Sequence, residues 1–167
     1  SFDEGSGTLA ADSSGSGNDG VLVGGPTWEE GQCGDALSFD GVDDSVAVSG
    51  ALSSIDGSEL TMEAWIHAPA EYDANYPRVF TDAGAENNYR ISLSPGTSEN
   101  RFLWRLEFGG AISSVYYEPT AFPADQWVHV AGVYDGSQMI LYIDGTSVGT
   151  TAVSGLIDPG TDLEIGI

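Results

Sequence analysis

The chain has 167 residues, of which 41% are hydrophobic, and it carries 26 acidic against 4 basic residues, which gives a formal net charge of −22 at pH 7. This length fits one domain with a sizeable core, and no apolar run approaches the ~20 residues that a membrane-spanning helix needs. The charge excludes nucleic acids and anionic membrane surfaces as partners, because both bind basic patches. It fits a saline, halophilic habitat, where salt screens the self-repulsion, and it fits an ordinary acidic secreted domain equally well.

Strand-like alternation of apolar and polar residues recurs along the chain. In chain order it occurs in residues 60–66, 89–93, 102–108, 128–134 and 139–143. Such alternation gives a strand one buried face. Asp135-Gly136 and Asp144-Gly145 follow the last two of these segments and predict hairpins, and residues 163–167 form a last short strand in this interpretation. We therefore expect an all-β antiparallel sandwich of the jelly-roll type.

Two of the predicted strands carry apolar side chains on both faces. Trp65 lies opposite the apolar row of residues 60–66, and Trp127 lies opposite Val128. Such strands are typical of a sheet that is covered on both sides, so we expect an extra layer over one face. His129 is expected to be hydrogen-bonded inside the sandwich and His67 to lie at its rim. The tryptophans are expected in the core: Trp28, Trp65, Trp104 and Trp127.

Five stretches resemble the LamG-like family, the laminin G-like domains with a concanavalin A-like jelly roll. They are residues 2–28, 36–48, 60–66, 126–136 and 141–149, in the order that the family has them. The resemblance implies the jelly-roll fold. It also implies that the sequence is trimmed at both ends, so that residues 1–167 form a single domain of a longer protein. In that case the last strand leaves a bare sheet edge, which a neighbouring chain or segment would complete.

The fold that the resemblance implies also hosts glycoside hydrolases. The retaining class needs two carboxylates about 5–5.5 Å apart. A Glu-x-Asp-x-Glu string would present such a pair on one face of a strand, and the sequence lacks this string. His67 and His129 have no Cys or His partner at the spacing of a metal site. We therefore expect no catalytic activity.

Two oxygen-rich segments are candidates for a structural calcium site. Ca²⁺ takes oxygen ligands from carboxylates, amide side chains and carbonyls. Residues 12–20 form a Gly-rich loop with Asp12 and Asn18, and residues 39–44 form an acidic turn with Asp40 and Asp43. Many of the domains that the chain resembles carry calcium near such loops. The alternative is that these residues only form turns, as Asp and Asn do without any metal.

Positive charge is confined to one region, because all four Arg residues lie between positions 78 and 105. Arg90 lies opposite the apolar face of one predicted strand, and Arg105 and Glu107 lie opposite the apolar face of another. If these strands are neighbours, the three side chains share a polar surface, and Tyr116 and Tyr117 are expected in exposed loops nearby. Guanidinium groups and aromatic rings predict a carbohydrate site. The alternative is that each Arg only pairs with neighbouring carboxylates.

Together these features predict a non-catalytic carbohydrate-binding or adhesion module of an extracellular or cell-surface protein, with a glycan or polysaccharide as its partner. The alternative is a structural or self-assembly domain of a surface filament or layer, completed by strand addition from a neighbour. The two predictions differ in the partner, which is a sugar in the first case and a polypeptide in the second.

Overall fold

The structure is a computed structural model that describes residues 2–53, 55, 57–69, 78–82, 91–96, 101–120, 123–158 and 160–166, with the backbone alone described for residues 91–96. The regular elements of these residues are the strands β1 to β14. The described residues include no helix that is long and apolar enough to cross a membrane. The predicted all-β fold is confirmed.

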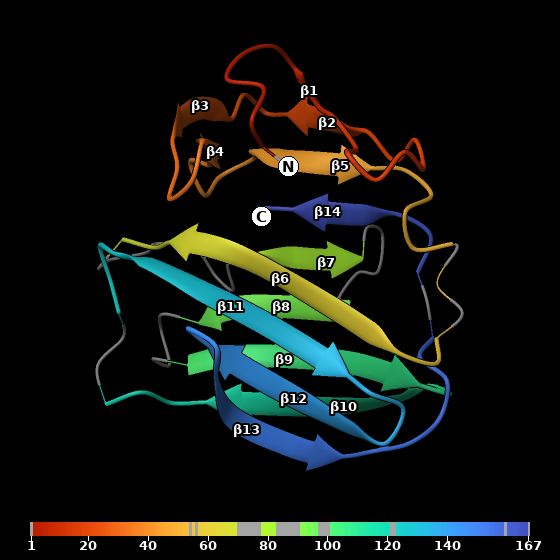
Figure 1. The fold of residues 1–167 in the computed structure, drawn as a ribbon. Helices are drawn as coiled ribbons and strands as arrows, with labels where there is room; N and C mark the ends of the chain where they lie inside the picture. The colour runs from red at the N-terminus through yellow and green to blue at the C-terminus, as the bar shows by residue number, and fades with distance from the viewer. Residues whose placement is uncertain are drawn as a thin grey trace.

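Most strands belong to two layered sheets (Figure 1). The larger sheet has eight strands in the order β1-β2-β5-β14-β7-β8-β9-β10, and the second has four in the order β13-β12-β11-β6. The larger sheet comprises β1 (Leu9–Ala10), β2 (Gly20–Val23), β5 (Ser45–Val48), β14 (Leu163–Ile165), β7 (Phe80–Asp82), β8 (Ile91–Gly96), β9 (Arg101–Phe108) and β10 (Ala111–Tyr117). The second comprises β6 (Leu60–His67), β11 (Trp127–Tyr134), β12 (Gln138–Ile143) and β13 (Thr146–Ala152). A separate hairpin joins β3 (Thr27–Glu30) to β4 (Asp35–Ser38).

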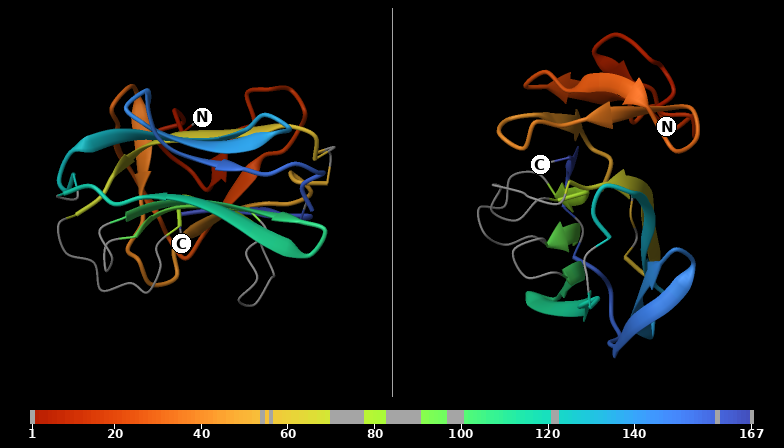
Figure 2. Two further views of the ribbon diagram at one scale, coloured as in Figure 1. Left: turned by 90° about the horizontal axis from the view of Figure 1, so that it is seen from below. Right: turned by 90° about the vertical axis from the view of Figure 1, so that its left-hand side faces the viewer.

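The main core lies between the four-stranded sheet and the half of the larger sheet that contains β7 to β10 (Figure 2). Phe102, Trp104 and Leu106 of β9 are fully buried there, because every second residue of this strand points inward. Trp104 fits because Gly132 of β11 has no side chain. A Cβ atom on Gly132 would lie 2.3 Å from the Trp104 ring. The prediction that Trp104 belongs to the core is confirmed.

A second, smaller core serves the other half of the larger sheet. Ala10, Val46 and Val48 of β1 and β5 are buried, and Leu37 of β4 packs against them. Leu163 of β14 packs against both cores. The apolar interior is therefore continuous through β14, the strand between the two halves of the sheet.

Both predicted hairpins are present. Asp135-Gly136 connects β11 to β12, and Asp144-Gly145 connects β12 to β13. Asp144 and Gly145 have φ angles of 48° and 74°. Two successive left-handed residues form the tight hairpin turn whose twist matches the flanking strands, and Asp-Gly is a favoured pair for it.

Two expectations about sheet edges are wrong. β14 is not at an edge, because it pairs with β5 on one side and β7 on the other. β6 is not central, because β11 is its only neighbouring strand among the described residues. The outward-facing Trp65 of β6 is 47% exposed, so the described part of the chain forms no extra layer over it.

Candidate functional site

The structure separates the residues that the sequence suggested for sugar binding. The strands β8 and β9 are neighbours, which a shared polar surface requires, but Arg90 lies outside the described residues. Arg105, Glu107 and Tyr116 lie on the outward face of the larger sheet, because the residues that alternate with them on β9 and β10 point into the core. Tyr117 lies on the opposite face and packs against the main core. The predicted set therefore does not form one surface.

Tyr117 and Glu107 are less exposed than expected. Tyr116 and Tyr117 belong to β10 rather than to a loop, and Tyr116 is 60% exposed while Tyr117 is partly buried. Glu107 is only 6% exposed, so its carboxylate does not meet solvent as a surface sugar site requires. Arg105 and Tyr116 remain as the accessible members on this face.

The two predicted calcium segments lie at opposite ends of the β2–β5 pair. Asp12 and Asn18 precede β2, and Asp40 and Asp43 precede β5, which runs antiparallel to β2. A strand of four residues, the length of β2, spans about 13 Å. The two segments therefore cannot share one ion.

The turn before β5 gathers three carboxylates. The ligand oxygens of Asp40, Asp43 and Asp44 all lie within 4.8 Å of one another. Asp44 accepts a hydrogen bond from the backbone N–H of Asp40 at 3.0 Å, and Asp40 accepts one from Val42 at 2.8 Å. The remaining oxygens form the hard, oxygen-only donor set that Ca²⁺ prefers, and calcium binding here stays a prediction.

Asp12 orders the loop before β2. Its carboxylate accepts hydrogen bonds from the backbone N–H groups of Ser14 at 2.8 Å and Asn18 at 3.0 Å. The Ser14 hydroxyl, followed by these N–H groups, lowers the pKa of Asp12 to about 2. Both carboxylate oxygens of Asp12 already accept hydrogen bonds from the chain itself. The contact between the two predicted calcium ligands, Asp12 and Asn18, is made by the backbone N–H of Asn18.

A surface that the sequence analysis did not select lies on the outward face of β6 and β11. We call it the His–Trp face, and it comprises Glu63, Trp65 and His67 of β6 with Trp127 and His129 of β11. These side chains point away from the inward residues of the same strands, which pack in the main core. Trp65 and the side chain of Glu63 are 47% and 63% exposed, so the surface is open to a ligand.

The rings of the His–Trp face pair across the two strands. The Trp65 and His129 ring centroids lie 5.3 Å apart with planes at 61°, and those of His67 and Trp127 lie 5.4 Å apart at 64°. Both are edge-to-face arrangements, which aromatic rings favour. The backbone N–H and C=O of His129 form their hydrogen bonds with Asp144, on the side away from β6. Trp65 and His129, which lie opposite each other, are therefore a non-hydrogen-bonded pair of the β6–β11 ladder. In such pairs the side chains lie closer together than in hydrogen-bonded pairs.

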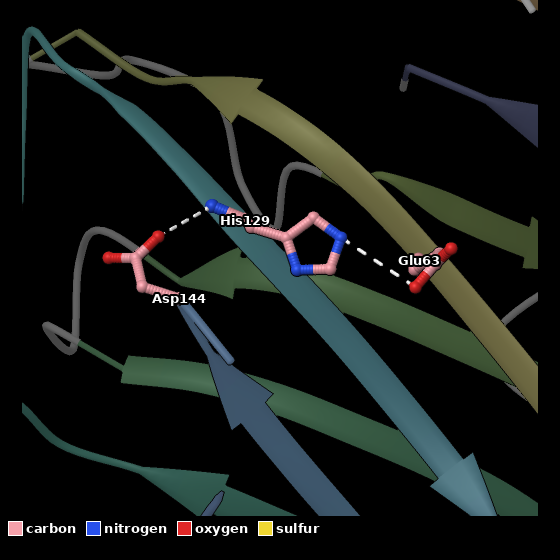
Figure 3. Close-up of polar contacts among 3 residues, drawn as sticks. All are labelled: Glu63, His129 and Asp144. Carbon is pink, nitrogen blue, oxygen red and sulfur yellow. Dashed lines mark hydrogen bonds and ion pairs between the residues drawn. The ribbon is translucent and has the colours of Figure 1, made fainter. Parts of the chain in front are cut away.

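Figure 3 shows how His129 is held in this surface. Its backbone N–H donates to Oδ1 of Asp144 at 2.9 Å, and its carbonyl accepts from the Asp144 N–H at 2.8 Å. Its imidazole Nε2 lies 3.7 Å from Oε2 of Glu63. The face therefore combines flat aromatic surface with a carboxylate and an imidazole that can hydrogen-bond a ligand.

The sequence contains a signal for this surface. Glu63, Trp65 and His67 alternate along one strand, and Trp127 and His129 alternate along another, so each set lies on one side of its strand.

The expectation that Trp65 lies in the core is wrong, and so is the expectation that His129 lies inside the sandwich. Trp28 and Trp127 are only partly buried. His67 is exposed at the end of β6, as expected of a rim residue.

Comparison with known proteins links the chain to one family. A family model described as the Concanavalin A-like lectin/glucanases superfamily matches residues 40–167. Mouse pappalysin-1 is 27% identical over 141 residues, which is 75% of this chain and 8% of that protein. The chain thus spans less than a tenth of the length of this curated relative.

Solved structures resemble the fold at low sequence identity. The binding domain of botulinum neurotoxin DC, in complex with SialylT, has a TM-score of 0.70 at 14% identity, covering 95% of this chain and 42% of that one. Domain 4 of an extracellular arabinanase from Geobacillus stearothermophilus, in complex with arabinotriose, has a TM-score of 0.61 at 18% identity, covering 93% and 85%. These likenesses establish the fold.

Proposed function

Because the chain belongs to the concanavalin A-like lectin/glucanase superfamily, we propose that it is a non-catalytic carbohydrate-binding module that contacts a glycan through the His–Trp face. The observation that carries the proposal is the exposed ring of Trp65 with His129 at its edge and Glu63 beside that histidine. Aromatic rings pack against the C–H face of a sugar, while the carboxylate and imidazole bond its hydroxyl groups. Residues on paired strands keep such a site rigid.

The charge of the chain supports a neutral glycan as the ligand. At a net charge of −22, acidic polysaccharides are repelled, and Glu63 adds a negative group within the face itself. The arabinanase domain was solved with arabinotriose, a neutral sugar, which makes arabinotriose a suitable first probe. We also propose an extracellular location, which the extracellular origin of that arabinanase supports.

The absence of catalysis is part of the proposal. Residues 145–149 have the Gly-x-Ser-x-Gly spacing of a nucleophile elbow, with Ser147 at its centre. They form the β12–β13 turn and the start of β13, whereas the elbow requires a sharp turn from a strand into a helix. This geometry supports a binding role over an acyl-transfer role.

A glycan array with matched variants tests the function. Wild-type protein is expected to bind at least one neutral glycan. Trp65→Ala should weaken this binding about tenfold, because an aromatic contact and its buried area contribute about 1–2 kcal/mol. Tyr116→Ala removes a ring that is even more exposed, at 60%, from the larger sheet and should bind as wild type does.

Three outcomes would contradict the proposal. If the wild type binds no glycan, the module does not act on carbohydrate. If Tyr116→Ala loses binding while Trp65→Ala keeps it, the site lies beside Arg105, where the sequence analysis expected it. If acidic glycans bind best, the charge argument is wrong.

A further inference from the structure

The outward face of the four-stranded sheet carries a further aromatic side chain, Tyr142 of β12. Both of its neighbours along the strand pack in the main core, so Tyr142 points to the opposite side. Its pairing places it on the same face as the His–Trp face. Tyr142 lies opposite Ala131 of β11, and Ala131 lies opposite Glu63 of β6. Figure 1 shows these three strands side by side in one layer.

The face continues from Trp65 to Tyr142 without a bulky residue between them. On β11, the residues between the two rings are His129, whose imidazole lies at the edge of the Trp65 ring, and Ala131. Ala131 has only a methyl group and is 6% exposed, because the side chains around it cover it. Beyond Tyr142, its partner Ser147 on β13 is exposed. The hydroxyl groups of Tyr142 and Ser147 can donate to and accept from a sugar.

Trp65 and Tyr142 lie too far apart for one sugar to contact both. Their positions differ by two strands across the sheet and by two residues along it, because Tyr142 is level with Glu63. At standard sheet spacings these offsets are about 10 Å and about 7 Å, so the two Cα atoms are about 12 Å apart. A monosaccharide ring is much smaller than this span, whereas a chain of linked sugars can lie along it.

We propose that Tyr142 forms a second sugar contact beside the His–Trp face, and that the ligand is a chain of several neutral sugar residues that crosses the sheet from Trp65 to Tyr142. This rests on the proposed function and names the class of glycan bound. One sugar stacks on each ring, and the polar groups of Glu63 and Ser147 bond hydroxyl groups along the chain. Once the first contact holds the chain, the second forms within the same complex, so affinity rises with chain length.

The dependence of affinity on chain length tests this arrangement. The probes are arabinose, arabinotriose and arabinohexaose, or the shorter and longer forms of the best neutral glycan of the array. Dissociation constants come from titrations that are followed by amide chemical shifts. The wild type is expected to bind arabinohexaose at least about tenfold more tightly than arabinose, because two contacts act within one ligand.

Variants of Tyr142 separate the second contact from the first. Tyr142→Ala should weaken arabinohexaose binding about fivefold, because one ring contact is lost, and should bind arabinose as wild type does. Tyr142→Phe keeps the ring and should keep most of the length dependence. Trp65→Ala should weaken both ligands. If circular dichroism shows that Tyr142→Ala is unfolded, Tyr142→Leu replaces it, because leucine keeps the apolar bulk without the ring.

Two results would overturn this inference while the proposed function stands. Equal affinity of the wild type for arabinose and arabinohexaose would mean that the face holds a single sugar. A length dependence that is unchanged in a folded Tyr142→Ala or Tyr142→Leu variant would mean that the chain leaves Trp65 in another direction. If the wild type binds none of these glycans and none on the array, the proposed function itself is wrong, and this inference with it.

Discussion

At the scale of single residues, the contact between Gly132 and Trp104 controls the fit of the two sheets. A Cβ atom on Gly132 would lie 2.3 Å from the Trp104 ring, which is fully buried and cannot move aside. Gly132→Ala is therefore expected to lower the free energy of unfolding by about 1–3 kcal/mol in urea titrations. In a Trp104→Leu background the same change should cost less, because the clash is gone. Equal losses in both backgrounds would refute the contact.

Asp135 gives a prediction about pH. The Ser137 hydroxyl, followed by the Ser137 N–H and the Gln138 side chain, lowers its pKa from 3.8 to about 2. A carboxyl whose pKa is lower in the folded state stabilises the fold above its unfolded pKa, and loses this contribution as the pH falls through the folded value. Asp135→Asn should therefore reduce the melting temperature at pH 7, and the difference should vanish between about pH 4 and pH 2.

The control for this prediction is Glu118→Gln, which neutralises an exposed acid elsewhere. It should show no comparable gap at pH 7. A gap between Asp135→Asn and wild type that stays constant down to pH 2 would mean that the turn depends on side-chain shape and not on charge.

At the scale of elements, the turn before β5 carries the calcium prediction. Three carboxylates within 4.8 Å of one another repel when no cation is present. Added Ca²⁺ is expected to raise the melting temperature, and EDTA to reverse the effect, because an ion that binds only the folded chain stabilises it. Asp43→Asn should reduce this response, while Asp12→Asn should keep it, since Asp12 lies at the other end of β2. A melting temperature that ignores both Ca²⁺ and EDTA would contradict the prediction.

Strands and hairpins could be predicted from the sequence because their signals are local. Alternation identified β6, β9, β11 and β12, and Asp-Gly identified the turns between β11, β12 and β13. The candidate site could not be predicted in the same way. Whether Trp65 is buried depends on what pairs with β6, and its partner β11 lies far along the chain. Tyr116 and Tyr117 differ only in strand phase, which places one outward and the other in the core.

At the scale of the whole molecule, the charge of −22 with no Lys makes stability depend on salt. Raising NaCl from 0.1 M to 1 M shortens the screening length from ~10 Å to ~3 Å and weakens the repulsion among carboxylates. The melting temperature is expected to rise over this range, with EDTA present to exclude divalent ions. A flat or falling melting temperature would show that repulsion does not limit the fold and would remove the physical support for a saline habitat.

The central claim is that a rigid aromatic surface on β6 and β11 binds a neutral glycan. The most direct measurement is a map of backbone amide chemical shifts during titration with arabinotriose or the best neutral glycan of the array. We predict that the shifts concentrate at residues 63, 65, 67, 127 and 129 and that Trp65→Ala abolishes them. Shifts concentrated on β9 and β10 around Arg105 and Tyr116, or no shifts with any glycan, would contradict the account.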